Sequence, residues 1–427
     1  MYDLIGVGFG PSNLALAIAV DEHNRTAETP VSALFLERQP RFGWHRGMLI
    51  DDATMQVSFL KDLVTLRNPT SEFSFLAYLH SKGRLVDFIN HKSLFPLRVE
   101  FHDYLEWAAD RFGDVVRYDH EVTEIGVEDE TGFAVVAGGT RFRARNLVLG
   151  MGMEPNLPDG VQLTDRIWHN RDLLDRIAGL ADPRRLAVVG AGQSAAEVTK
   201  FLHERFPNAE VCGIFSRYGY SPSDDSPFAN RVFDPAAVDQ YFVAPDEVKR
   251  RILDYHGNTN YSVVDADLIE ELYRRVYREK VLGTERLRLY NVSRVVDVVQ
   301  PGDGVRVTVE SLTTRERSVL DCDAVVYATG YRPIDPLTVL GAAGAICRLD
   351  DAGRVRVDRD YRVLTDPDRG PGVYLQGGTE HTHGISSSLL STTVVRAGDI
   401  LQSIISRRNP GPDMWTPATL ADVGLVR

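Results

Sequence analysis

The sequence has few of the residues and patterns that mark secreted, membrane-spanning or metal-binding proteins. Only three of its 427 residues are cysteines, and Cys212, Cys322 and Cys347 show neither CxxC nor metal-ligand spacing. Scattered cysteines of this kind are typical of reduced thiols in a cytoplasmic protein. No apolar run is long enough to cross a bilayer, and the run at residues 14–20 fits a helix that follows a glycine turn.

Positive charge is also scarce. The chain carries 48 lysines and arginines against 60 aspartates and glutamates, a formal net charge of −12. This balance argues against nucleic acid or an anionic membrane as the main partner. No basic leader precedes the apolar residues 4–7, so we expect a soluble, cytoplasmic protein. The length is sufficient for two or three domains.

A glycine-rich turn follows the first apolar segment. Gly6, Gly8 and Gly10 stand where a βα turn needs a tight bend and a close approach to phosphate, and Pro11 opens the next helix. The free N–H groups and positive dipole end of a helix N-terminus attract a pyrophosphate. Glu37 follows the next apolar strand, in the place of the acid that binds ribose hydroxyls. These features predict a dinucleotide site.

A second turn of the same kind begins at Gly190 and continues through Gly192 and Ser194. The strand after this turn ends in Ser216 and Arg217 instead of an acid. An acid would repel a 2′-phosphate, whereas a hydroxyl and a guanidinium would bind it. We therefore expect NADPH rather than NADH at the second turn.

The pattern of strand, glycine turn and helix thus occurs twice, and each occurrence has a later apolar strand that ends in small residues, at 146–152 and 324–331. One such turn alone could serve helix packing, but two indicate electron transfer from nicotinamide to flavin. We predict an α/β fold with two Rossmann-like dinucleotide-binding domains, the second inserted in the first, and a small, mostly helical substrate region. The expected ranges are 1–165 and 324–427 for the FAD-binding domain, 166–220 and 281–323 for the NADPH-binding domain, and 221–280 for the substrate region.

Several segments outside the two turns narrow the class of flavoprotein. No cysteine pair accompanies the predicted flavin site, which excludes a disulfide reductase. The informative segments are 55–63 with 67–69, 101–105, 225–230, 258–263, 328–331 and 381–385. In type and order they resemble motifs of the flavin-dependent N-hydroxylating monooxygenases of L-ornithine and L-lysine, nearly from end to end of the chain.

The resemblance implies roles for the substrate-side residues. Lys61 pairs with the α-carboxylate of the substrate, in keeping with the need of a buried carboxylate for a cation. Asn230 contacts the substrate backbone, and Asn260 lies between the substrate and the nicotinamide ribose. Ser391 reaches the substrate from the serine-rich stretch expected to open the last helix. Asn260 and Gln56 are the implied catalytic residues. The alternatives are a solvated lysine, turn asparagines and an N-cap serine.

On the cofactor side, the resemblance places Trp44, His45 and Gln56 along the isoalloxazine ring of FAD. A flat aromatic beside a flat cofactor is reasonable packing, although Trp44 could equally fill a core and His45 could be structural. Leu389 contacts FAD through its backbone, and Gln193 lies on the nicotinamide side. No protein-bound metal is expected.

The family's reaction uses NADPH to reduce FAD, which then captures O2 as a C4a-hydroperoxide that must be kept from water. The substrate amine must be neutral to attack, yet a lysine-like amine has a pKa of about 10.4 in water. We therefore predict that no acidic residue contacts the reacting nitrogen, since burial without a carboxylate partner lowers its pKa. The expected product is N5-hydroxyornithine for hydroxamate siderophores or related products.

Other functions remain open on the sequence alone. A lysine N6-hydroxylase differs by one methylene, worth only ~0.8 kcal/mol of burial. A diamine hydroxylase, a Baeyer–Villiger-type monooxygenase, and a flavoprotein that transfers electrons or senses a ligand without oxygenation are further alternatives. The family tends to associate, so we expect a homo-oligomer.

Overall fold

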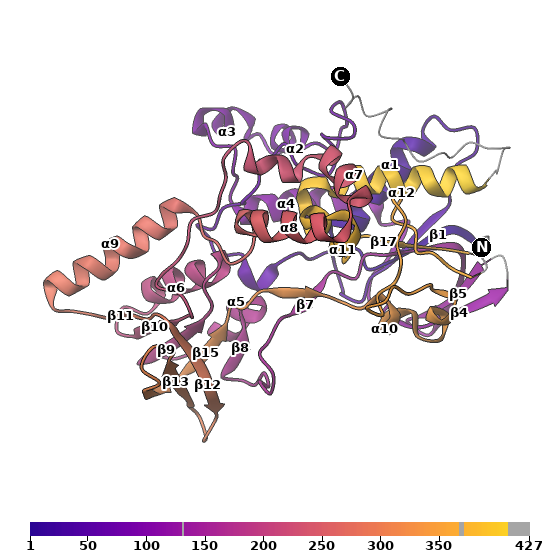
Figure 1. Ribbon diagram of the computed structural model, residues 1–427. Helices are drawn as coiled ribbons and strands as arrows, with labels where there is room; N and C mark the ends of the chain where they lie inside the picture. The colour runs from indigo at the N-terminus through magenta and orange to yellow at the C-terminus, as the bar shows by residue number, and fades with distance from the viewer. Residues whose placement is uncertain (130–131, 367–370, 409–427) are drawn as a thin grey trace.

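The computed structural model describes residues 1–129, 132–366 and 371–408. Two sheets form its body, a mixed one on the right and a parallel one at the lower left of Figure 1. No helix among the described residues is long and apolar enough to cross a membrane. Short 3-10 turns are η1 (Arg46–Met48), η2 (Asp110–Phe112), η3 (Asn170–Asp172), η4 (Ala229–Phe233), η5 (Gly257–Thr259), η6 (Gly341–Ile346), η7 (Ile385–Ser388) and η8 (Leu390–Thr392).

The first sheet has the strand order β3-β2-β1-β6-β5-β4, and β17 also pairs with β6. Its strands are β1 (Tyr2–Val7), β2 (Ala33–Leu36), β3 (Val116–Arg117), β4 (Val122–Asp129), β5 (Gly132–Ala137), β6 (Thr140–Leu149) and β17 (Gly372–Leu375). The pairs around β1 and the β17–β6 pair are parallel, whereas β4, β5 and β6 form an antiparallel meander.

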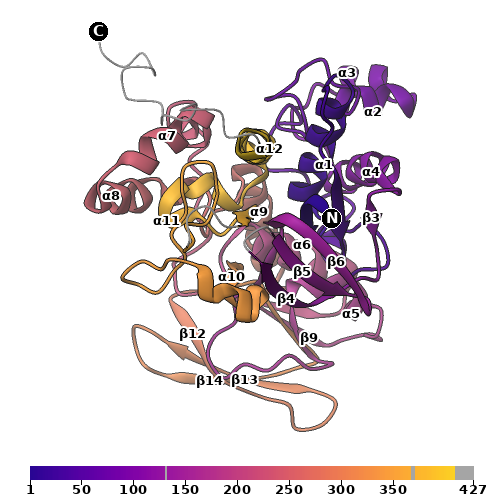
Figure 2. The same cartoon turned by 90° about the vertical axis from the view of Figure 1, so that its right-hand side faces the viewer.

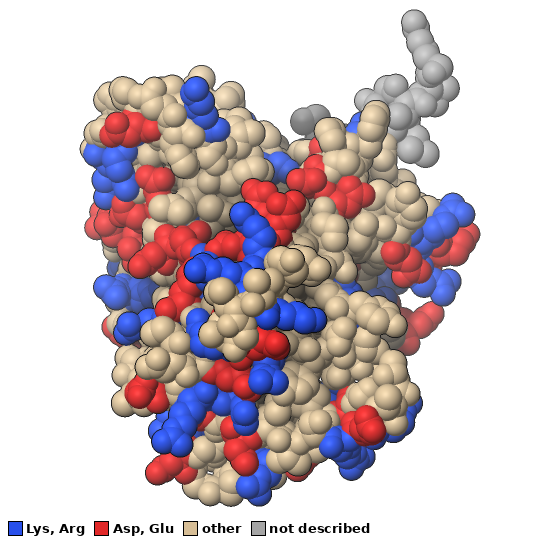
Figure 3. Space-filling model, turned by 90° about the vertical axis from the view of Figure 1, so that its left-hand side faces the viewer, with Lys and Arg blue, Asp and Glu red and all other residues tan. Residues whose placement is uncertain are grey.

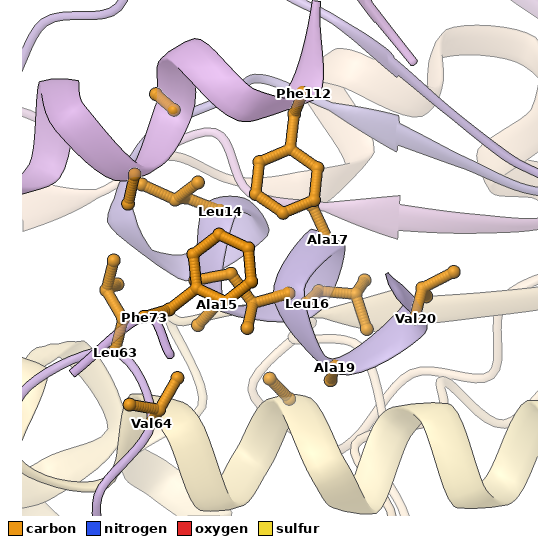
Figure 4. Packing of buried hydrophobic residues seen from close by; sticks show 14 of the residues in the cluster. Leu14, Ala15, Leu16, Ala17, Ala19, Val20, Leu63, Val64, Phe73 and Phe112 are labelled. Carbon is orange, nitrogen blue, oxygen red and sulfur yellow. The ribbon is translucent and has the colours of Figure 1, made fainter. Parts of the chain in front are cut away.

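In helix α1 (Pro11–Asn24), residues 13–20 are all buried and 14–20 are apolar on every side, as expected of a helix segment surrounded by other elements. Phe73 and Phe112 pack beside it, and the yellow helix α12 (Thr393–Arg408) runs beneath it (Figure 4). Burial of each large apolar side chain contributes roughly 1.5–3 kcal/mol. The remaining helices of this unit are α2 (Phe75–Ser81), α3 (Leu85–His91), α4 (Arg98–Ala109), α10 (Pro336–Leu340) and α11 (Glu380–His383).

The second sheet is entirely parallel and has the order β11-β10-β9-β15-β8. Its strands are β8 (Ile167–His169), β9 (Arg185–Val189), β10 (Glu210–Ile214), β11 (Leu287–Tyr290) and β15 (Ala324–Tyr327). Helices α5 (Leu173–Ile177), α6 (Gln193–Arg205) and α9 (Ala266–Leu282) accompany it. An antiparallel sheet lies alongside, made of β12 (Ser293–Val299), β13 (Val305–Ser311) and β14 (Arg317–Cys322).

Two antiparallel connecting strands, β7 (Met153–Pro155) and β16 (Tyr331–Pro333), join the sheets. The chain leaves the first sheet after β6, builds the second sheet, and returns through β16 to finish with β17 and α12. Figure 2 shows α7 (Pro235–Val243) and α8 (Asp246–His256) on the opposite side from α1 to α4. The predicted α/β class is confirmed.

Two predicted boundaries need correction. The sequence predicts that 324–427 lies wholly in the first unit, but β15 pairs with β9 and β8 in the second sheet. Its four side chains are all buried, Ala324 and Val326 in one hydrophobic core and Val325 and Tyr327 in another, as in a parallel strand covered on both faces.

The helical region 221–280 is also not one body. Helix α7 contacts α11 near the end of the first unit, whereas α9 packs on α6 and on the second core through Leu272.

The last helix begins at Thr393, because the serine-rich stretch before it forms the two turns η7 and η8 instead of helix.

Candidate active site

A cavity of about 2830 Å³ lies where the carboxyl ends of β1 and β9 meet. Open α/β sheets bind ligands at this position, because the glycine turns and helix N-termini converge there. Both glycine turns line the cavity, as do segments from the connecting strands and from the loops before α12. One continuous space therefore joins the two predicted dinucleotide sites.

The three glycines of the first turn have different environments. Gly8 has a φ of +83°, and a Cβ there would lie 2.5 Å from the Gly150 carbonyl oxygen. Gly10 precedes α1, and a Cβ at this position would meet no atom within 4 Å. The absence of a side chain at Gly10 therefore leaves space open in the cavity. Gly6 does not line the cavity. A Cβ there would collide with the Phe35 ring, so Gly6 serves the packing of β1 on β2.

Glu37 follows β2 and borders the cavity with a side chain that is 6% exposed. Its carboxylate accepts hydrogen bonds from the backbone N–H groups of Phe9 at 2.6 Å and Gln39 at 2.9 Å. A carboxylate has about four acceptor positions, so ribose hydroxyls could still donate to it.

In the second turn, Gly190 has a φ of +141° and its α-carbon faces the Ala328 carbonyl too closely for any side chain. Gly192 precedes α6, and Ser194 lies in its first turn on the cavity wall. This turn therefore repeats the geometry of the first, with a strand, a tight bend and a helix N-terminus facing the cavity.

Ser216 and Arg217 follow β10 and line the same cavity. Arg217 is exposed and donates a hydrogen bond to the Ser262 carbonyl oxygen at 2.8 Å. This hydrogen bond uses one guanidinium N–H, so most of the donors of Arg217 remain available for an anion.

Trp44, His45 and Gln56 lie between the two turns and line the cavity. His45 adopts a left-handed backbone with a φ of 50°, and its ring is 4.7 Å from that of Trp44 and 5.9 Å from that of Tyr331. Desolvation by the surrounding protein, together with Arg98, lowers the pKa of His45 to about 4. The His45 imidazole is therefore neutral near pH 7.

Lys61 projects into the cavity with its ammonium 5.6 Å from the centre of the Phe233 ring. Desolvation lowers its pKa, and Asp234 opposes this effect from a distance. Asp234 itself is paired with Arg231 at 3.5 Å. Within the described part of the chain, no carboxylate is in ion-pair contact with Lys61, so its charge can receive an external anion.

The other predicted substrate residues reach the same cavity from separate elements. Asn230 lies in η4 and donates through Nδ2 to the Asp225 carbonyl at 2.7 Å. Asn260 follows η5, whereas Leu389 and Ser391 come from the turns before α12. Ser391 is only 4% exposed. Residues far apart in the chain thus converge, and all predicted site residues except Gly6 line the cavity.

A polar network behind Gln193 was not predicted. Gln193 donates through Nε2 to Glu197 at 3.0 Å and to Asp265 at 3.3 Å, and its Oε1 accepts from the Asp265 N–H at 2.9 Å. Glu197 in turn accepts two hydrogen bonds from Arg98 at 2.8 and 2.9 Å. Glu197 stands four residues after Gln193 on one helix face, so the spacing could have indicated their contact. Nothing in the sequence indicates Arg98 as the partner of Glu197.

A second unpredicted contact lies on the cavity wall. The Tyr261 hydroxyl donates to the Glu380 carboxylate, and both residues line the cavity. Desolvation raises the pKa of Glu380, while this hydrogen bond acts in the opposite direction.

In the described residues no group of three or more histidine, cysteine or acidic side chains could hold a metal ion.

Comparison with known proteins gives consistent matches. A family model described as L-lysine 6-monooxygenase/L-ornithine 5-monooxygenase matches residues 1–333. An L-ornithine N(5)-monooxygenase of Burkholderia cepacia is 42% identical over 405 residues, which cover 90% of each chain. The solved ornithine N-hydroxylase of Kutzneria sp. 744, described as KtzI-FADred-NADP+-L-orn, has a TM-score of 0.92 and 47% identity, covering 96% of this chain and all of that one. An L-lysine 6-monooxygenase from Pseudomonas syringae has a TM-score of 0.84 and 32% identity, with coverage of 96% and 100%.

Proposed function

Because the chain belongs to the L-lysine 6-monooxygenase/L-ornithine 5-monooxygenase family, we propose that it uses FAD, NADPH and O2 to hydroxylate the side-chain nitrogen of L-ornithine. The enzyme is an L-ornithine N5-monooxygenase. One oxygen atom enters the amine, the other leaves as water, and NADPH is oxidised to NADP+. The product, N5-hydroxyornithine, suits a hydroxamate siderophore, since a hydroxamate offers hard oxygen ligands to iron.

Ornithine is favoured over lysine by the relatives. The ornithine enzymes described above are 42% and 47% identical to this chain, whereas the lysine enzyme is 32% identical. The two substrates differ by one methylene, so discrimination depends on the depth of the pocket between Lys61 and the reacting centre.

The first turn fits FAD. The space that Gly10 leaves open at the start of α1 suits a pyrophosphate, and Glu37 would accept the ribose hydroxyls. Trp44, His45 and Gln56 would border the flavin ring. When bound, FAD supplies the redox chemistry that passes electrons from the nicotinamide to O2. His45 contributes a neutral hydrogen-bonding group at physiological pH.

The second turn fits NADPH. The N-terminus of α6 would face the pyrophosphate, and Ser216 with Arg217 would bind the 2′-phosphate. Gln193 would contact the nicotinamide side, held in place by Glu197 and Asp265. The Arg217 guanidinium is the group that would favour NADPH over NADH.

The observation that carries the substrate proposal is Lys61, a partly desolvated cation in the cavity without an ion-pair partner among the described residues. It would bind the α-carboxylate, while Asn230, Asn260 and Ser391 orient the substrate by hydrogen bonds. The amine end would then lie away from Lys61 and lose its proton more readily, because burial disfavours the charged form.

We expect Lys61→Ala to lower kcat/KM for ornithine by roughly 10- to 100-fold, since a hydrogen bond to a charged group contributes about 1.5–3 kcal/mol. Turnover of butane-1,4-diamine, which lacks the carboxylate, should change little. N-hydroxylated product and NADPH oxidation are measured together. Lys82→Ala, at the residue that follows α2 and outside the cavity, is the matched control.

Two outcomes would contradict this assignment. If the wild-type enzyme turned over the diamine as well as ornithine, Lys61 would have no role in carboxylate binding. If NADPH oxidation yielded hydrogen peroxide without any N-hydroxylated product from ornithine or lysine, the protein would be an oxidase or an electron-transfer flavoprotein.

A further inference from the structure

Arg396 on helix α12 is a buried cation that the proposed function does not yet use. Its side chain is 1% exposed, and no carboxylate among the described residues forms an ion pair with it. Asp399, which acts on Arg396 electrostatically, is itself paired with Arg359 at 3.0 Å. Desolvation lowers the pKa of Arg396, but a guanidinium keeps its proton in proteins. The interior near α12 therefore holds a positive charge that no direct contact with an acid cancels.

Charges on the surface are arranged differently. On the face of the molecule in Figure 3, basic and acidic side chains are interspersed, and water solvates both. A buried ion has lost its hydration, so it lowers the stability of the fold unless other groups replace the water.

Neutral groups replace water around Arg396. Its Nε donates to Gln376 Oε1 at 3.0 Å. One terminal nitrogen donates to the Thr393 hydroxyl at 3.2 Å, and the other donates to the Ser387 carbonyl. The centre of the Tyr361 ring lies 5.8 Å from the guanidinium carbon, within the range of a cation–π contact. These contacts hold the guanidinium in place and leave its charge unneutralised.

Tyr361 has a backbone conformation that large side chains rarely adopt. Its φ is +65°, although the side chain is 3% exposed and belongs to the core. A left-handed backbone strains an L-residue, and strained residues cluster at functional sites. The strain occurs at the residue whose ring covers the guanidinium, which is a second indication that Arg396 serves more than packing.

Arg396 lies directly behind the cavity wall. The wall segment 388–391 is flanked by the two residues whose oxygens accept from its terminal nitrogens. Its third hydrogen-bond partner, Gln376, donates through Nε2 to the Ser12 carbonyl at 3.2 Å. Ser12 lies in the first turn of α1 and lines the cavity, whereas Arg396 and Gln376 do not. The charge is therefore one residue away from two parts of the proposed FAD site.

We propose that Arg396 stabilises the negative charge that FAD gains on reduction. A hydride from NADPH brings two electrons and one proton, so it adds one negative charge to the FAD ring. A cation behind the wall interacts strongly with this charge, because little water screens it in the interior. The positive end of α12, which begins at Thr393 on the cavity wall, acts in the same direction. This inference deepens the proposed function and rests on the proposed FAD site.

The midpoint potential of FAD in the full-length, FAD-loaded enzyme tests the proposal. Arg396→Met should weaken the preference of the protein for reduced over oxidised FAD at least tenfold. This change corresponds to a fall of about 30 mV in the two-electron midpoint potential. Arg396→Lys keeps the charge but loses the fork of hydrogen bonds, so it should retain most of the wild-type potential. Anaerobic titration against a reference dye measures each potential.

Arg407→Met is the matched control. It removes the same charge from the same helix, but Arg407 is paired with Asp360 at 3.3 Å and does not line the cavity, so the potential should be unchanged.

Gln376→Glu tests the charge without removing Arg396. A carboxylate of the same size as the amide would lie against the guanidinium and neutralise it, so the potential should again fall. This variant decides the question if Arg396→Met does not retain FAD.

Two results would overturn the proposal. Wild-type potentials in the FAD-loaded charge-removing variants would show that the charge of Arg396 does not act on FAD. Equal falls in Arg396→Lys and Arg396→Met would show that Arg396 only supports the turns before α12. A wild-type protein that binds no FAD would instead contradict the proposed function itself.

Discussion

At the residue scale, neighbouring glycines of one turn have different physical roles. Gly8 has a backbone conformation that side chains rarely adopt and lies against a carbonyl group, so the fold requires it. Gly10 has an ordinary extended conformation with open space around its α-carbon, so it is needed only if a ligand occupies that space. The two positions can therefore separate folding from FAD binding.

We expect Gly8→Ala to lower the free energy of unfolding of the apoprotein by about 2 kcal/mol or more, from left-handed strain and the carbonyl contact. Gly10→Ala should change it by less than about 1 kcal/mol, a modest effect of a changed N-cap. Gly10→Ala should nevertheless weaken FAD binding strongly. Urea unfolding and FAD titration measure the two effects, and an unchanged FAD affinity in Gly10→Ala would place the pyrophosphate elsewhere.

At the scale of elements, one buried ion pair joins the two units. Arg98 at the start of α4 contacts Glu197 on α6 through two hydrogen bonds, and the side chains are only 12% and 6% exposed. Segment 48–53 of the first unit also packs into the core of the second sheet. Since Glu197 also bonds Gln193, the orientation of the units is linked to the nicotinamide side of the cavity.

Glu197→Gln leaves the Arg98 charge buried without its partner, so the free energy of unfolding should fall by about 3 kcal/mol. The rate of flavin reduction by NADPH should fall as well, because Gln193 loses its charged acceptor. Glu204→Gln on the same helix removes the more exposed ion pair with Arg275. This change should lower the free energy of unfolding by less than about 1 kcal/mol. Denaturant unfolding and anaerobic stopped-flow measurements test both effects. If Glu197→Gln and Glu204→Gln had equal rates of flavin reduction, Glu197 would have no role in positioning Gln193.

At the scale of the whole molecule, histidine protonation couples the fold to pH. Six of the 11 histidines have a pKa lowered mainly by desolvation. His383 is the extreme case, with a pKa of about 3. It is 1% exposed, stacks on Tyr361 with ring centres 4.1 Å apart, and bonds the Arg359 carbonyl at 3.2 Å.

A depressed pKa in the folded state means that the neutral form is stabilised. The stability contributed by His383 is fully present above its unfolded pKa of about 6.5 and is lost as the pH falls toward 3. One proton changes the free energy of unfolding by about 1.4 kcal/mol per pH unit in this window. We expect His383→Gln to reduce the slope of the free energy of unfolding against pH by the equivalent of nearly one proton between about pH 6 and about pH 4. Urea unfolding at a series of pH values measures this slope. The exposed His80→Gln should leave the slope unchanged, and an unaltered slope in His383→Gln would disprove this coupling.

Much of the site could be predicted because its parts are local. A strand, a glycine bend and a helix start obey backbone sterics within about ten residues, so both turns were recognised from the chain alone. Gly6 and β15 were misplaced for the opposite reason. The neighbour of Gly6 is Phe35 on another strand, and the place of β15 depends on β8 and β9, which are distant in the chain.

The amino-acid sequence by itself determined the α/β class, the two glycine turns with the helix N-termini that follow them, and the motifs that supply Lys61 and the two asparagines. Only the tertiary structure decided that β15 belongs to the second sheet, that Arg98 meets Glu197, and that Arg396 is buried behind the cavity wall. The physical reason is that backbone conformation follows from neighbouring residues, whereas pairing, burial and exposure depend on which distant segments pack together.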